Sequence, residues 1–105
     1  MNVNDLIKQL PSALNPASAS NMQSTIQYSI SNPMYIVIDN GKCTVHEGVA
    51  PASDVNLKMA DEDLAALLKG ELNGVTAFMT GKLKLEGDMM LAQRLPSLFD
   101  GSKLG

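Results

Sequence analysis

The apolar residues of this 105-residue chain follow two periods, one typical of helices and one typical of strands. Near the amino terminus they recur at helical spacing, at Val3, Leu6, Ile7 and Leu10. Pro11 lacks the backbone N–H that would continue this helix, so we expect the helix to end there. Residues 15–24 are mostly Ala, Ser, Asn and Pro, and this composition predicts a connector.

Three strands are predicted next. Ile26, Tyr28 and Ile30 alternate with polar residues, which predicts a strand with one buried face and one solvated face. Residues 34–38 are apolar at every position, which predicts a strand covered on both faces. The pair Asn40-Gly41 follows this strand. These residue types favour a type I′ turn because both positions of such a turn need a positive φ.

The predicted turn sets the pairing of a hairpin, and a further strand follows it. The expected pairs are Asp39 with Lys42, Ile38 with Cys43, and Ile36 with Val45. Beyond the hairpin, residues 48–51 break the pattern, and apolar residues alternate again over 55–59. This alternation predicts a fourth strand.

Two helices are expected after the fourth strand. Asp61 is a good cap for a helix over 61–69, and Gly70 stands where such a helix ends. Asn73 can cap a shorter helix over 73–80. Both helices are amphipathic, so we expect each to be stable only when packed on another element.

A fifth strand and a last helix complete the predicted elements. Residues 82–86 alternate between polar and apolar, and Asp88 can cap the helix that follows. Pro96 lies inside that helix, so the helix either kinks at Pro96 or stops near Leu95.

The order of elements predicts one α+β (mixed α/β) domain over residues 1–105, with a five-stranded mixed sheet covered by helices on one face. The strands at 55–59 and 83–85 are separated by two helices, which permits a crossover connection between them.

Composition and charge exclude several classes of protein. The net charge is −3 without a basic cluster, which argues against a nucleic-acid partner. One cysteine excludes an internal disulfide and suits a reducing compartment. There is neither an apolar run of membrane-spanning length nor a signal-peptide pattern, so a cytoplasmic location is expected. Residues 102–104 spell a peroxisomal address, which we do not credit because Gly105 follows it.

The sequence offers little catalytic chemistry. His46 is the only histidine, and neither a carboxylate motif nor a nucleophile elbow lies beside it, so a partly exposed strand histidine is expected. Cys43 follows the apolar alternation and is expected in the core. The acidic residues 61–63 fit helix capping better than metal ligation, and phosphate-binding and dinucleotide-binding glycine motifs are missing. We expect a protein that is not an enzyme, without a cofactor or a metal.

Two stretches resemble a known family. The run AFMTGKLKLEGDMMLA at residues 77–92 closely resembles the signature of the sterol carrier protein 2 (SCP2) family, and LKMAD at 57–61 resembles the same family's strand-to-helix segment. The resemblance implies a sheet covered by helices, with an apolar cavity between the layers. It also implies that the cavity lies under the helices over 61–69, 73–80 and 88–98.

The resemblance implies that apolar side chains of these helices and of the sheet line the cavity. The expected lining residues are Ile36, Met59, Leu68, Phe78, Met79, Leu83, Leu91, Leu95 and Leu98. Plain core packing is the alternative for each of them. Among the seven methionines, Met34, Met59, Met79 and one of Met89 or Met90 stand at positions expected to be buried, where a flexible side chain adapts to varied apolar partners.

Three functions remain open. The first is non-catalytic binding and carriage of a fatty acid, acyl-CoA, sterol or phospholipid by a monomer with transient membrane contact. The second is an accessory module that presents a lipid or a docking surface to a partner enzyme. The third, an enzyme built around His46, is kept only for completeness.

Overall fold

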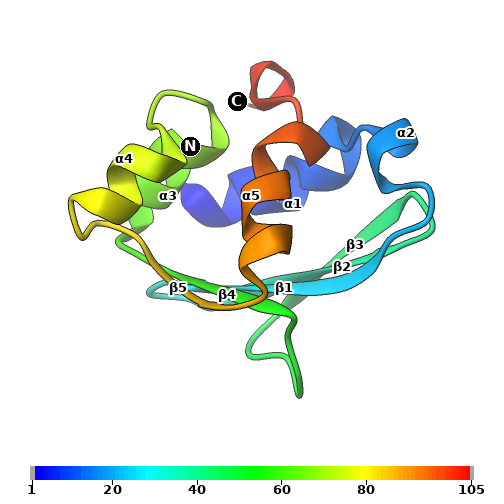
Figure 1. Ribbon diagram of the computed structural model, residues 1–105, viewed down its shortest axis with the longest axis horizontal. Coiled ribbons are helices and arrows are strands. Elements are labelled where there is room, and N and C mark those ends of the chain that lie inside the picture. Colours follow the sequence, from blue (N-terminus) through cyan, green and yellow to red (C-terminus); the bar gives the residue numbers. More distant parts are fainter. Residues whose placement is uncertain (1, 105) are drawn as a thin grey trace.

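The computed structural model describes residues 2–104, and all its helices lie on one face of a five-stranded sheet (Figure 1). The elements in chain order are α1 (Val3–Ala13), α2 (Pro16–Ala19), β1 (Gln23–Ser29), β2 (Met34–Asp39), β3 (Lys42–Glu47), β4 (Val55–Lys58), α3 (Asp61–Leu68), α4 (Gly74–Met79), β5 (Lys84–Gly87), α5 (Met89–Leu98) and the short 3-10 turn η1 (Gly101–Lys103). This arrangement confirms the predicted α+β class.

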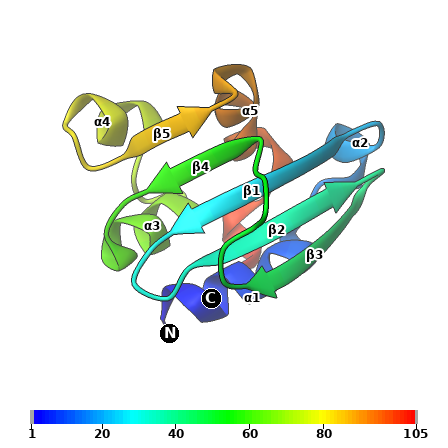
Figure 2. The same cartoon turned by 90° about the horizontal axis from the view of Figure 1, so that it is seen from below.

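The sheet is mixed, as predicted, but its parallel pair is different from the one suggested by the sequence. The strand order is β3-β2-β1-β4-β5, and only β1 and β4 pair in parallel, whereas β4 and β5 are antiparallel. The connection through α3 and α4 therefore joins two antiparallel neighbours, β4 and β5, and is not a crossover. The crossover is made by the loop between β3 and β4, which runs across the sheet face that carries no helix (Figure 2).

The β2–β3 hairpin has the predicted register. Asn40 and Gly41 have φ values of 49° and 83°, as a type I′ turn requires. Ile38 lies opposite Cys43, and Ile36 lies opposite Val45. The two-residue period of the strands then places these pairs on the face that the helices cover.

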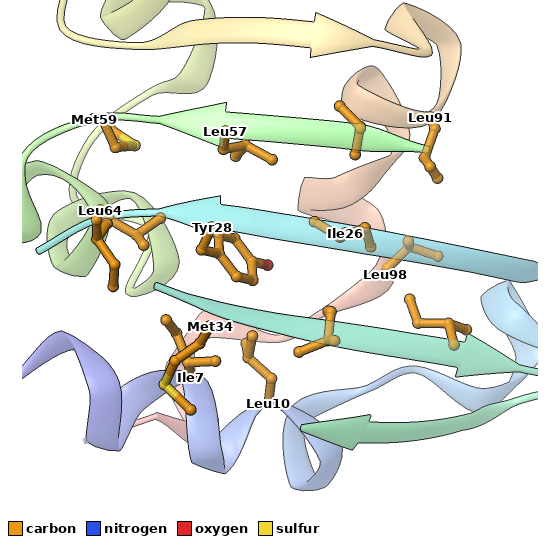
Figure 3. Packing of buried hydrophobic residues seen from close by; sticks show 14 of the residues in the cluster. Ile7, Leu10, Ile26, Tyr28, Met34, Leu57, Met59, Leu64, Leu91 and Leu98 are labelled. Carbon is orange, nitrogen blue, oxygen red and sulfur yellow. The ribbon is translucent and has the colours of Figure 1, made fainter. Parts of the chain in front are cut away.

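The core fills the space between the helices and the sheet (Figure 3). α1 buries more side chains than the other helices, and they are Val3, Leu6, Ile7, Leu10 and Ala13. The prediction that Pro11 ends this helix was wrong, because α1 continues to Ala13. Pro11 forfeits one backbone hydrogen bond near the helix end. Burial of Ala13 and Leu14 stabilises the last turn of α1 despite this loss.

The carboxyl-terminal helices differ from the predictions at the cap of α3, and they decide between the two alternatives left open at Pro96. Asp61 is the first residue of α3 rather than its cap, and its carboxylate accepts hydrogen bonds from the backbone N–H (2.9 Å) and the hydroxyl of Ser31 in the β1–β2 turn. These bonds lower the pKa of Asp61. α5 does not stop near Leu95 but runs through Pro96 to Leu98, whose side chain is fully buried.

The other predicted capping residues occupy their expected positions. The side chain of Asn73 caps α4 by accepting from the N–H groups of Val75 (2.8 Å) and Thr76 (3.3 Å). The side chain of Asp88 caps α5 in the same way.

The sheet face without helices corrects two further predictions. Tyr35 and Val37 of β2 point to this face and stay partly exposed, so β2 is not covered on both sides. Gln27, predicted to be solvated, is only 3% exposed. The β3–β4 loop causes this burial, because it crosses the sheet over β1 (Figure 2).

Gln27 fastens that loop to the sheet. Its side-chain amide donates to the carbonyl oxygens of Met34 and Gly48, each at 3.2 Å. Its side-chain oxygen accepts from the N–H of Ala50 at 2.8 Å. One buried amide thus bonds backbone groups of both the sheet and the loop, and its own polar atoms are satisfied away from bulk water.

We predict that Gln27→Ala lowers the free energy of unfolding by about 1–3 kcal/mol, because it removes the hydrogen bonds of a buried side chain to the sheet and to the loop. The matched control is Gln23→Ala, since Gln23 lies on the same strand but is exposed, and its side-chain amide donates to the Asp39 carboxylate at 3.3 Å. Urea denaturation measures both changes. Equal losses for the two variants would contradict this account of the loop.

Candidate functional site

Most of the residues expected to line a cavity come together between the helices and the sheet. Ile36, Met59, Leu83, Leu91 and Leu98 belong to one buried cluster, and Leu68 and Leu95 are partly buried against it. Figure 3 shows Met59 at one end of the sheet and Leu91 and Leu98 toward the other. The sheet and α5 therefore provide a shared apolar surface.

Phe78 and Met79 lie outside this cluster. They are 53% and 80% exposed, on the outer side of α4. The six-residue helix α4 buries only Ala77, because so short a helix turns few side chains toward the core. The expected burial of Met79, and of Met89 or Met90, was wrong, whereas Met34 and Met59 are buried as predicted.

The helices and the sheet are packed directly against each other. Ile36 and Leu98 have no exposed surface, so neither borders a space that a water molecule could enter. Two hollows of about 420 and 520 Å³ lie at the molecular surface, and both are bordered by α1 residues. None of the nine expected lining residues borders either hollow.

Sequence reasoning missed part of the same cluster. Tyr28 and Leu64 are buried in it, and so are Ile7 and Leu10 of α1 (Figure 3). The helical spacing at 3–10 predicted that Ile7 and Leu10 are buried, and the alternation at 26–30 predicted the same of Tyr28. Nothing in the one-dimensional pattern indicated that they share a surface with Leu91 and Leu98.

The ionisable groups near this core are uncharged at neutral pH. Burial raises the pKa of the Tyr28 hydroxyl well above its ordinary value, with a smaller contribution from Cys43. Burial also raises the pKa of the Cys43 thiol to about 11. In residues 2–104, buried side-chain nitrogen and oxygen atoms all have hydrogen-bond partners. The interior is thus apolar and electrically neutral.

His46 and Cys43 cannot act together, because they point to opposite faces of β3. The His46 ring stacks on Tyr35 with the ring centroids 5.0 Å apart, and its Nε2 lies 3.0 Å from the hydroxyl oxygen of Thr44. This environment is that of an exposed strand histidine, as predicted.

Residues 2–104 contain no group of three or more His, Cys, Asp or Glu residues that could hold a metal ion. Among the helices described, none is both long and apolar enough to span a bilayer.

We predict that iodoacetamide alkylates Cys43 about a hundredfold more slowly in the folded protein than in urea at pH 8, because the pKa near 11 suppresses the thiolate. The unfolded chain loses this proton first as pH rises. The thiol contribution to stability is therefore constant below pH 9 and is lost between about 9 and 11. Mass spectrometry of timed samples measures the rates, and equal rates would show that the thiol is accessible.

Comparisons with known proteins agree on one family. The sequence model of the SCP-2 sterol transfer family matches residues 3–100. Sterol carrier protein 2 of Bos taurus is 44% identical over 61 residues, which cover 58% of this chain and 11% of the bovine protein. The chain thus spans a small part of that relative.

Solved structures show the same fold. The NMR structure of palmitated SCP2L2 from Aedes aegypti is 25% identical with a TM-score of 0.74, covering 92% of this chain and 93% of that one. A stereoselective inverting sec-alkylsulfatase from a Pseudomonas species is 24% identical with a TM-score of 0.83, covering 92% of this chain but 16% of the sulfatase. Because the family match extends over nearly the whole sequence, the chain belongs to the SCP-2 sterol transfer family.

Proposed function

We propose that this chain binds and carries a hydrophobic ligand, such as a fatty acid, a fatty acyl chain, a sterol-like molecule or a phospholipid, without catalysing a reaction on it. The observation that carries the proposal is the family match over residues 3–100. Two features support it. The interface between the helices and the sheet is apolar, and the ionisable groups beside it are neutral at physiological pH.

The proposed binding region lies between the sheet and the helices α3, α4 and α5. Ligand entry requires these layers to separate, because Ile36 and Leu98 are packed without exposed surface. The helices differ in how firmly they are held. α1 buries five side chains, whereas α3 and α4 bury one each and α5 buries two. The carboxyl-terminal helices therefore need less energy to move, since fewer apolar contacts are lost.

Burial of hydrocarbon would drive this binding. Each methylene group removed from water contributes about 0.8 kcal/mol, so an acyl chain of fatty-acid length offers on the order of 10 kcal/mol before costs. Separation of the layers and ordering of the chain subtract from this amount. Net affinity then depends on how easily α3, α4 and α5 move.

The polar groups of the region favour broad ligand selection. Tyr28 and Cys43 remain neutral at neutral pH, so they do not repel a carboxylate, and neither residue type can carry a positive charge that would pair with one. A charged head group would thus stay at the rim, in contact with water. Few convergent polar groups mean that the chain length and shape of the ligand matter more than its head group.

We predict that the purified protein carries a stoichiometric fatty acid or phospholipid, because the apolar interface gains stability from hydrocarbon. Native mass spectrometry followed by organic extraction identifies the ligand. A protein that is empty as purified and fails to take up palmitate would refute the carrier function.

We further predict that Leu95→Arg weakens palmitate binding by roughly tenfold or more, because a charge enters the proposed apolar region. The matched control is Gln93→Arg, which adds the same charge to an exposed position of α5 and should bind normally. Lys84→Ala should also bind normally in an assay without membranes. Circular dichroism checks that each variant is folded. If Leu95→Arg does not fold, Leu95→Gln is tested in its place. Equal affinities for Leu95→Arg and Gln93→Arg would mean that the region is misplaced.

A second candidate is an accessory module that presents a lipid substrate or a docking surface to a partner enzyme. It is supported by the occurrence of this fold as 16% of a sulfatase chain. Such a module would bind palmitate weakly alone and would co-purify with its enzyme. A cytoplasmic location, a monomeric state and transient membrane contact remain predictions, and light scattering tests the monomer.

A further inference from the structure

Large apolar side chains are exposed mainly at one rim of the molecule. In the described part of the chain six such side chains are exposed, and five of them lie on α4 or on the first turn of α5, on either side of the edge strand β5. They are Val75, Phe78, Met79, Met89 and Met90. The sixth, Val49, lies in the β3–β4 loop.

α4 has an inverted distribution of side chains. Helices on a globular core normally turn their large apolar residues inward. α4 instead buries Ala77 and exposes Val75, Phe78 and Met79. Ala77 attaches it to the rest of the molecule, since its side chain is buried and its carbonyl oxygen accepts from the N–H groups of residues 82 and 83 at 2.9 and 3.0 Å. The exposed face is therefore not needed to hold the helix in place.

The segment from α4 into β5, between Glu71 and Glu86, carries positive charge although the whole chain is negative. Residues 72–85 contain Lys82 and Lys84 and no acidic residue, in a chain with a net charge of −3. Both lysines are exposed, and within residues 2–104 neither side chain forms an ion pair. The other end of β5 differs, because Glu86 and Asp88 precede the two methionines of α5. The apolar face and the positive charge thus coincide at α4.

We propose that the α4 surface, defined as Val75, Phe78, Met79, Lys82 and Lys84, docks this protein on an anionic phospholipid membrane. Apolar side chains flanked by lysines suit the boundary between head groups and acyl chains, where the rings and chains are buried and the ammonium groups meet lipid phosphates. The proposal extends the proposed carrier function by naming the surface through which a carrier would reach its lipid.

The size and shape of the surface favour a membrane over a protein partner. Three apolar side chains on a convex six-residue helix offer a few hundred Å², whereas a stable protein interface buries about 800 Å² per partner. In Figure 1, α4 projects at the margin of the helix layer, away from α1. A projecting apolar helix can enter a soft, flat surface without a matching groove.

Sedimentation with vesicles tests the proposal. Wild-type protein is mixed with phosphatidylcholine vesicles with and without about 30% phosphatidylglycerol, and we expect binding to increase with the anionic lipid. Phe78→Ser and Met79→Ser should each weaken binding by roughly tenfold. Lys82→Glu should abolish the preference for anionic vesicles. The matched controls are Val49→Ser, an equally exposed apolar residue in the β3–β4 loop, and Lys42→Glu on the opposite edge strand.

Palmitate binding without vesicles separates this proposal from the carrier function. Unchanged palmitate affinity of Phe78→Ser with lost vesicle binding supports docking through α4. Vesicle binding by a protein that takes up no palmitate also supports docking, and refutes only the carrier function. Docking is overturned if the wild-type protein does not bind anionic vesicles, or if Val49→Ser weakens vesicle binding as much as Phe78→Ser does. It is also overturned if Phe78→Ser loses palmitate affinity. A dimer in light scattering that Phe78→Ser dissociates would overturn it as well.

Discussion

Packing of the helices against one face of the sheet is the interaction on which the rest of the structure depends. Strand side chains alternate between faces, so the register of the hairpin decides which residues reach the helices. Ile36 and Ile38 reach them and are fully buried, whereas Tyr35 and Val37 face outward. The parallel pairing of β1 and β4 then forces the connecting loop across the outer face, and the buried amide of Gln27 compensates the backbone groups covered there.

The helices are attached to the sheet by different numbers of buried side chains, so the amino-terminal and carboxyl-terminal helices have different roles. α1 anchors the amino-terminal half through a row of buried side chains, and it does so beyond Pro11. α3 and α4 are attached by one buried side chain each, together with capping and turn hydrogen bonds such as those between Asp61 and Ser31. A lipid that enters between the layers would displace the weakly held helices and leave α1 on the sheet.

The interior of the molecule and the outer surface of α4 carry different apolar side chains. Family resemblance assigned Phe78 and Met79 to a cavity, whereas the structure places both on the outside. A carrier needs an apolar interior for its ligand and a surface that meets the membrane holding that ligand. Separate residues supply the two properties in the functions proposed above, so variants on α4 and α5 distinguish them.

The sequence by itself determined the element types, the caps at Asn73 and Asp88, the hairpin register and the family. These features are local, since they follow from φ preferences, from short hydrogen bonds and from the period of apolar residues. Tertiary structure decided the rest, because burial depends on residues distant in the chain. Packing carried α1 through Pro11 and α5 through Pro96, and the crossing loop buried Gln27. Met79 is exposed because α4 has only six residues and buries a single side chain, which the apolar period of the sequence did not indicate.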